Sequence, residues 1–348
     1  MQDSDYMKLA AEEALKARGM TQTNPLVGAV IVKKDQVLAT GYHHQFGGVH
    51  AEVDALNNLA DLRLAQGATL YVTLEPCSHY GKQPPCSYQI AAAGIKQVII
   101  GQVDPHQIVS GKGISYLEAH GVKTKLLGQT EFLNEAYNFF YQRQRPLVTL
   151  KYAMSVDGKL NEEQEKRTFI TGQAAQLDTQ VLRLDQQAIL IGANTLRIDN
   201  PALTVRIKKL PVPPVRIVLT HDANCLDFNK KLFNLPGRIW LLSNVALTKS
   251  VRENVTCFVD QEWTPAKIMR LLAEKEIQSL LIEGGSNLQA QFMAAKLVDK
   301  IVAYVAPVIL GGTAMPVAMG PRLERPLHYQ LVDLRTCGED VRICLRRE

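Results

Sequence analysis

The sequence has few cysteines and no long apolar run, and both shortages limit what it can be. Six cysteines are scattered over 348 residues, which is no disulfide framework. No stretch of about eighteen apolar residues is present to cross a bilayer. The N-terminal segment Met1-Gln2-Asp3-Ser4-Asp5 is acidic and no apolar segment follows it, so we expect no signal peptide. We therefore expect a cytoplasmic protein with no membrane partner.

The chain also lacks a long Lys/Arg run, an internal repeat and a low-complexity segment. Its net charge of +5 is mildly basic, which suits a phosphorylated substrate and cofactor and gives little support for a nucleic-acid partner. With 46% hydrophobic and 21% charged residues, the composition is that of an ordinary globular protein. The length favours two domains.

Apolar periodicity predicts helices and strands that alternate along the N-terminal part of the chain. The predicted helices span residues 5–18, 51–66 and 86–93, and the predicted strands span 27–33, 36–42, 69–74 and 96–101. Gly94 would end the third helix. Strands that alternate with helices predict an α/β/α layered domain.

The pattern starts again after Arg143-Gln144-Arg145-Pro146, which we interpret as a linker. Further strands are predicted over residues 147–153, 188–192, 215–220, 238–243, 279–282 and 300–305, with helical patterns between several of them. The sequence therefore predicts one domain over residues 1–145 and a second α/β domain over residues 146–348.

The most specific motif is His50-Ala51-Glu52, followed later by Cys77 and Cys86. Imidazole nitrogen and thiolate sulfur are ligands that zinc prefers, and a site with three protein ligands keeps a position open for water. Glu52, two residues after the histidine, is placed to move protons to and from that water. Zinc deaminases of nucleobases carry H-x-E and P-C-x-x-C, but here eight residues separate the two cysteines.

The segments around these residues and the longer spacing of the two cysteines both resemble one known family. Asn24-Pro25-Leu26-Val27-Gly28, Glu75-Pro76-Cys77-Ser78-His79 and Pro84-Pro85-Cys86 together resemble the pyrimidine deaminase domain of the bifunctional riboflavin-biosynthesis deaminase/reductase, up to about residue 145. The resemblance implies a cytidine-deaminase-like fold. It also implies zinc held by His50, Cys77 and Cys86, with Glu52 as the catalytic acid and base.

The same resemblance assigns substrate contacts in the deaminase domain. It makes Asn24 a reader of the base edge, and His43, His79 and Lys82 further substrate contacts. Each has a plainer alternative: a turn residue for Asn24, surface histidines and a solvated loop lysine.

In the second half, Glu283-Gly284-Gly285-Ser286-Asn287 follows a predicted strand and opens a helix. Two glycines let the backbone approach a pyrophosphate at a helix N-terminus. The motif lacks the full G-x-G-x-x-G pattern, so a plain strand-to-helix turn is the alternative. Segments 151–159 and 194–206 favour the first interpretation, because they resemble the reductase domain of the same family over residues 147 to about 320. The resemblance implies a dihydrofolate-reductase-like fold and NADPH.

By position, the resemblance divides the reductase site into two sets. The residues toward NADPH would be Ala153, Phe169, Thr195, Asp199, Gly284, Gly285 and Ser286. Those toward the substrate would be Lys151, Arg167, Thr171, Arg183, Leu203, Arg206 and Glu283. Arg183 and Arg206 are candidate phosphate clamps, because a planar guanidinium matches phosphate oxygens. Arg167 and Phe169 stand where relatives often carry Ser and Trp, and Phe169 can still stack as Trp would.

We interpret the sequence as a bifunctional riboflavin-biosynthesis enzyme that acts on a small phosphorylated pyrimidine, and we expect a homo-oligomer. It would remove the C2 amine of a diamino-pyrimidinone ribosylamine phosphate and then reduce the ribosyl to a ribityl chain with NADPH. One alternative is a tRNA or cytidine deaminase, but the compact C-x-x-C is absent and the second half would be unexplained. Another is a non-catalytic zinc-stabilised nucleic-acid-binding module, which the three-ligand set, Glu52 and the lack of a basic-aromatic stripe oppose.

Overall fold

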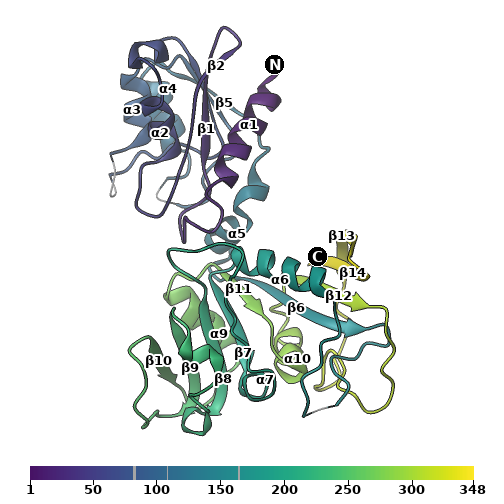
Figure 1. The fold of residues 1–348 in the computed structure, drawn as a ribbon. Coiled ribbons are helices and arrows are strands. Elements are labelled where there is room, and N and C mark those ends of the chain that lie inside the picture. The colour runs from purple at the N-terminus through teal and green to yellow at the C-terminus, as the bar shows by residue number, and fades with distance from the viewer. Residues whose placement is uncertain (81–83, 108, 164) are drawn as a thin grey trace. The chain divides into compact units, whose positions relative to one another are not determined.

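The computed structural model describes residues 1–80, 84–107, 109–163 and 165–348. The chain divides into two compact units, Met1–Gln144 and Arg145–Glu348. Each is built around its own β-sheet (Figure 1). None of the helices in the described part of the chain is long and apolar enough to cross a membrane.

The first unit has a five-stranded sheet with the order β2-β1-β3-β4-β5. The strands are β1 (Gly28–Lys33), β2 (Gln36–Tyr42), β3 (Thr69–Val72), β4 (Gln97–Ile100) and β5 (Lys123–Leu126). The strands β3, β4 and β5 run parallel, and β1 is antiparallel to both neighbours. Lys34 and Asp35 join β1 to β2 with positive φ angles of 49° and 61°, the backbone that a two-residue hairpin requires.

Helices cover both faces of this sheet (Figure 1). They are α1 (Asp3–Leu15), α2 (Ala51–Asn57), α3 (Cys86–Ala92), α4 (Lys112–Ala119) and α5 (Glu135–Arg143), with 3-10 turns at Leu62–Ala65 and Glu131–Asn134. On one face, Met7 of α1 packs in a cluster with Val30. On the other, Ala55, Ile90 and Leu117 of α2, α3 and α4 share a core. The predicted α/β/α layering is therefore confirmed.

The helix predicted over residues 51–66 is shorter in the structure. It ends at Asn57, and a separate 3-10 turn follows at Leu62–Ala65. Asp61 begins that turn, and its side chain accepts a hydrogen bond from the backbone N–H of Arg63. Short polar side chains compete with helical hydrogen bonds in this way, and apolar periodicity alone does not register the competition.

The second unit has a nine-stranded sheet with the order β10-β9-β8-β7-β11-β6-β12-β14-β13. The strands are β6 (Leu147–Ser155), β7 (Ala188–Gly192), β8 (Val215–Asp222), β9 (Ile239–Val245), β10 (Val255–Val259), β11 (Ser279–Ile282), β12 (Lys300–Ala306), β13 (Tyr329–Cys337) and β14 (Asp340–Arg347). The strands from β10 to β12 in this order run parallel, and β14 and β13 form an antiparallel hairpin at one edge.

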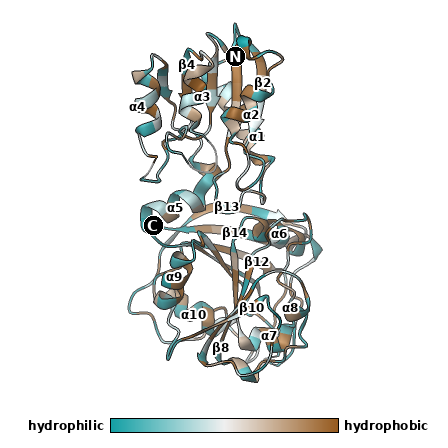
Figure 2. Cartoon of the chain, turned by 90° about the vertical axis from the view of Figure 1, so that its left-hand side faces the viewer, coloured by the Kyte–Doolittle hydropathy of each residue, from teal (hydrophilic) through white to brown (hydrophobic). Residues whose placement is uncertain are grey.

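Both faces of the parallel part are covered. The helices are α6 (Gln173–Leu184), α7 (Ala193–Asp199), α8 (Lys231–Asn234), α9 (Pro265–Glu274) and α10 (Ser286–Ala294). Leu190 packs with α9 and α10, whereas its neighbour Ile189 packs with α7 and α8. A strand buried on both faces reads as a continuous apolar run, and the brown strands of Figure 2 reflect this.

The strand order of this sheet indicates where a ligand can bind. Strand β11 lies between β7 and β6 although it follows both in the chain. The turns that leave β7 and β11 therefore come together at the carboxyl ends of parallel strands, where open α/β sheets bind ligands. Gly192, Glu283 and residues 151–153 of β6 line one cavity at this edge.

Candidate active sites

The first site lies in the first unit, where three zinc-type ligands converge. His50 begins α2 and Cys86 is the first residue of α3, while Cys77 follows β3. The Nδ1 atom of His50 lies 3.1 Å from the Sγ atom of Cys86 and 3.5 Å from that of Cys77. Tetrahedral zinc with bonds of about 2.0–2.3 Å holds its ligand atoms roughly 3.5 Å apart. The donor set and its spacing therefore fit zinc.

The two cysteine side chains differ in how readily they lose a proton. The hydrogen bond between the two thiol groups lowers the pKa of Cys77 and raises the pKa of Cys86. The hydrogen bond with Cys77 raises the pKa of His50. Cys77 is thus the thiolate of the pair, the form in which cysteine binds a metal. Zinc held here would supply a Lewis acid that lowers the pKa of water.

Glu52 lies in the first turn of α2, next to these ligands. It is 3% exposed. Burial raises its pKa to about 7, although the nearby His50 acts in the opposite direction. A carboxyl group with a pKa near neutrality can both accept and return a proton, as a general acid and base must.

His50, Cys77 and Glu52 line a cavity of about 380 Å³, and Cys86 is buried behind it. Asn24, His43 and His79 line it as well. The ring of His43 is buried, and it donates from Nδ1 to the carbonyl of Val49. Its Nε2 atom therefore accepts from the side-chain amide of Asn24, at 3.1 Å. His43 orients Asn24, and Lys82 lies outside the described residues.

The sequence did not point to four further residues of this cavity, namely Asp104, His106, Tyr137 and Tyr141. Asp104 is buried and accepts a hydrogen bond of 3.0 Å from the hydroxyl of Tyr137. Burial raises the pKa of Asp104. The one signal available was that Asp104 follows β4, a parallel strand of the sheet, because no spacing connects it with the zinc motif.

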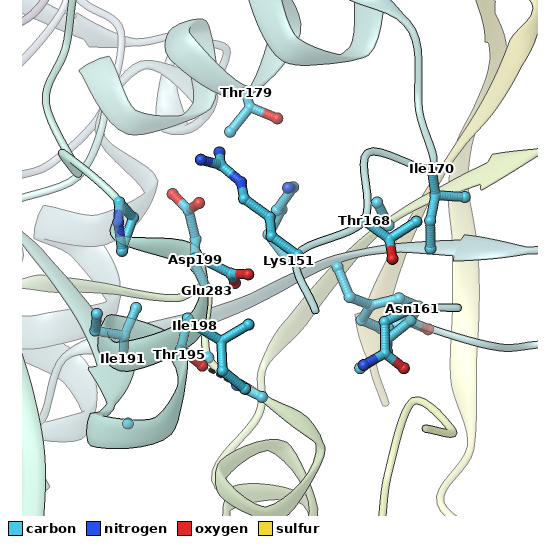
Figure 3. Close-up of a pocket in the computed structure, with 18 of the residues that line it drawn as sticks. Lys151, Asn161, Thr168, Ile170, Thr179, Ile191, Thr195, Ile198, Asp199 and Glu283 are labelled. Carbon is cyan, nitrogen blue, oxygen red and sulfur yellow. Dashed lines mark hydrogen bonds between the residues drawn. The ribbon is translucent and has the colours of Figure 1, made fainter. Parts of the chain in front are cut away.

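The second site is a cavity of about 420 Å³ at the carboxyl ends of β6, β7 and β11. Every residue that the sequence assigned to the reductase site lines it. Figure 3 shows Lys151, Asp199 and Glu283 grouped in the cavity, with Thr195 beside them and Asn161, Thr168 and Ile170 farther along. Asn161, Thr168 and Gln180 are lining residues that the sequence gave no reason to select.

The glycine turn between β11 and α10 has the features of a phosphate-binding turn. The N–H of Gly285 donates to the hydroxyl of Thr195, at 3.1 Å. The hydroxyl of Ser286 is buried and has no hydrogen-bond partner within the described part of the chain. The first N–H groups of a helix also lack partners within it. These groups together fit the pyrophosphate of a dinucleotide such as NADPH.

The pKa values of Lys151 and Asp199 in the cavity are both shifted in the direction that favours the uncharged form. Burial lowers the pKa of Lys151, and the charges of Glu283 and Asp199 oppose that change. Burial raises the pKa of Asp199, against the charges of Arg167 and Lys151. Shifts of this kind are common where side chains exchange protons with a substrate.

Arg183 lines the cavity and is paired with a carboxylate there. Its guanidinium makes two hydrogen bonds to Glu283, of 2.6 and 2.7 Å, and a third to the carbonyl of Thr204. Three of its five N–H groups are thus used within the protein, and its role as a phosphate clamp stays a prediction. Arg206 is exposed and has no carboxylate partner among the described residues. Arg167 is also exposed, with its guanidinium carbon 4.2 Å from the ring centre of Phe169.

The first site has the parts of a zinc-dependent deaminase, and the second has those of a dinucleotide-dependent reductase. The model of the cytidine and deoxycytidylate deaminase zinc-binding region matches residues 1–102. The model of the RibD C-terminal domain matches residues 146–343.

Whole-chain comparisons agree. The riboflavin biosynthesis protein RibD of Bacillus amyloliquefaciens is 38% identical over 97% of this chain and 94% of its own. That of Escherichia coli K12 is 33% identical over 98% of each chain. Among solved structures, Acinetobacter baumannii RibD is 32% identical with a TM-score of 0.89, and a Thermotoga maritima deaminase/reductase is 31% identical with a TM-score of 0.90; both comparisons cover 99% of each chain.

The chain belongs to the RibD family of riboflavin biosynthesis proteins. It is therefore a bifunctional enzyme with a deaminase and a reductase activity, and its cofactors are Zn²⁺ and NADPH. The expected fold class, a deaminase-like α/β/α unit followed by a dihydrofolate-reductase-like α/β unit, is confirmed. Neither a tRNA deaminase nor a non-catalytic zinc module is supported.

Proposed function

We propose that the unit Met1–Gln144 carries the deaminase and the unit Arg145–Glu348 the reductase. The Thermotoga maritima relative is described as a diaminohydroxyphosphoribosylaminopyrimidine deaminase and a 5-amino-6-(5-phosphoribosylamino)uracil reductase, and we propose the same two substrates here. The observation that carries this proposal is the convergence of His50, Cys77 and Cys86 beside a cavity that Glu52 lines.

In the deaminase site, His50, Cys77 and Cys86 would hold the zinc. Glu52 accepts the proton of the attacking water and returns it, first to the ring nitrogen and then to the leaving amine. Asn24, fixed by its contact with His43, reads the edge of the pyrimidine. His79 and Lys82 remain proposed substrate contacts on the loop between the cysteines.

In the reductase site, the glycine turn and Ser286 hold the cofactor's pyrophosphate, while Ala153, Thr195 and Asp199 line the rest of the cofactor pocket. Phe169 is 67% exposed, and Arg167 lies over its ring; we assign the ring to stacking on a planar ring of the cofactor.

The substrate side of this site contains Lys151, Thr171, Leu203 and Glu283. Leu203 is buried with a φ of +50°, a backbone rarely adopted by leucine and most often found at functional sites. Arg206 and Arg167 line the cavity with solvent-exposed side chains, and we assign the substrate phosphate to their guanidinium groups. Arg183 orients Glu283.

The decisive experiment is to incubate the purified full chain with the synthetic diamino-pyrimidinone phosphate, with and without NADPH, and to analyse the products by mass. We expect release of ammonia alone without NADPH, and the ribityl product when NADPH is present. Reduction without deamination, or no turnover of this compound, would contradict the proposal.

The proposal includes a cytoplasmic homo-oligomer that does not bind nucleic acid. The net charge of +5 is only mildly basic, and the sequence has no long Lys/Arg run to bind a phosphate backbone. Light scattering would test the oligomeric state. Salt-dependent binding of RNA would contradict the proposal that the protein does not bind nucleic acid.

A further inference from the structure

We propose that Glu75 is a positioning residue that fixes the substrate-facing wall of the deaminase cavity to the loop that carries Cys77. The wall consists of Asp104, His106 and Val109. Glu75 immediately precedes Pro76 and Cys77 and is 3% exposed. The inference rests on the proposed deaminase function of this cavity.

Both carboxylate oxygens of Glu75 are occupied by backbone donors. Oε1 accepts from the N–H groups of Gly113 and Ile114, at 3.0 and 3.3 Å. Oε2 accepts from those of Gly111 and Asp104, at 3.0 and 3.3 Å. A carboxylate offers about four lone-pair sites. Glu75 therefore has no capacity left to act on substrate or water, unlike Glu52.

The four donors belong to two neighbouring parts of the chain. Asp104 opens the wall of the cavity, and the other three lie at the start of α4. The first N–H groups of a helix have no partner within it, and an acidic group stabilises them. One buried carboxylate thus binds the beginning and the end of the segment that forms the wall.

A second contact joins the start of α4 to the loop of Cys77 without using the carboxylate. A Cβ atom added at Gly113 would lie 1.9 Å from the carbonyl oxygen of Pro76 and 3.2 Å from Oε1 of Glu75. Only glycine allows this approach between α4 and the loop of Cys77. The start of α4 is therefore held against the metal-ligand loop by backbone contact as well as by Glu75.

Cys77 has its own supports. Its carbonyl accepts from the N–H of Ser87 at 3.1 Å, and its sulfur accepts from the N–H of Cys86 at 3.3 Å. Loss of the Glu75 carboxylate should therefore free the wall and leave the zinc ligands in place. This separates a positioning role from a role in metal binding.

The test is Glu75→Gln in the full chain, in which an amide NH₂ replaces one oxygen and faces two backbone donors. We expect zinc content equal to the parent's and a KM for the deaminase substrate that is about tenfold higher or more, the effect of a lost hydrogen bond to a charged acceptor. The kcat should change less than KM. Calorimetric affinity for the deaminated product should fall in parallel, and reductase kinetics should not change.

Two further variants complete the test. Gly113→Ala should reproduce the higher KM with full zinc, although it keeps the carboxylate. Asp61→Asn is the matched control, because Asp61 also accepts a backbone N–H at the start of a helical turn but does not line the cavity. It should behave as the parent does.

Loss of zinc in folded Glu75→Gln would overturn the proposal, and so would an unchanged KM with a lower kcat. If Glu75→Gln does not fold, Glu75→Asp and Gly113→Ala decide, and parental KM values in both would overturn it. A parent protein that does not deaminate the substrate would instead refute the proposed function.

Discussion

The guanidinium of Arg183 on α6 and the carboxylate of Glu283 after β11 form a buried pair with two parallel hydrogen bonds, of 2.6 and 2.7 Å. Their side chains are 10% and 7% exposed. Burial alone would raise the pKa of Glu283, but the charge and hydrogen bonds of Arg183, together with the charges of Lys151 and Arg206, outweigh it and the pKa is lowered. The pair fixes a charged group of the reductase cavity in one orientation.

Removal of Arg183 should destabilise the second unit. Arg183→Met leaves the Glu283 charge buried without its partner, and such losses typically cost about 3–5 kcal/mol. Urea unfolding followed by tryptophan fluorescence measures this, because both tryptophans of the chain, Trp240 and Trp263, lie in this unit.

The pH dependence of that difference has a defined sign. The pKa of Glu283 in the folded protein lies below its ordinary value of 4.5. Its contribution is therefore fully present above that value and is lost as pH falls through the folded pKa. The gap in unfolding free energy between the parent and Arg183→Met should be constant near neutral pH and shrink in acid. A gap that widens in acid would contradict the pairing.

Replacement of a zinc ligand should remove the metal. Cys86→Ser exchanges a buried thiol for a poorer zinc ligand, and a catalytic site with only three protein ligands cannot spare one. Metal analysis should show about one zinc per chain in the parent and little in the variant. Cys225→Ser, at an exposed free cysteine, should retain the metal. Full zinc in Cys86→Ser would refute the ligand assignment.

Glu52→Gln should keep zinc and lose deamination. The amide has nearly the same shape but cannot take up the proton of water, and general acid–base catalysis is typically worth ~10²–10⁴-fold. Steady-state ammonia release measures the loss, with metal analysis beside it. Near-normal turnover would show that another group moves the proton.

The two activities should be separable. The same Glu52→Gln variant should reduce the deaminated compound at the parental rate when that compound is supplied, because the second cavity is lined by residues of the second unit alone. NADPH oxidation followed by absorbance tests this. Loss of both activities in a variant that stays folded would contradict independent sites.

Arg206 and Asp199 should affect different ligands of the reductase. Arg206→Ala removes a charged contact worth ~1.5–3 kcal/mol, so the KM for the substrate should rise about tenfold or more, with little change for NADPH. Asp199→Ala should weaken NADPH binding or slow hydride transfer. Arg270→Ala, at an exposed position of α9, is the control. If Arg206→Ala weakens NADPH and spares the substrate, the two roles are exchanged.

Much of the architecture could be predicted because its signals are local. Strands β7 and β11 have the predicted ends, Ala188–Gly192 and Ser279–Ile282, since apolar runs of this kind are bounded by polar residues and glycine. The end of α2 at Asn57 was missed because the apolar pattern does not separate this helix from the 3-10 turn that follows, which Asp61 caps.

The sequence by itself predicted the zinc-ligand set, the place of Glu52 in the first turn of a helix, and the glycine turn before Ser286, because each depends on residue types at short, fixed spacings. Only the tertiary structure decided that Arg183 is held by Glu283, that Asp104 faces the zinc site, and that Glu75 joins α4 to the loop of Cys77. Those contacts connect residues far apart in the chain. A side chain's type fixes what it can bind, but the packing of the sheet and helices fixes which partner reaches it first.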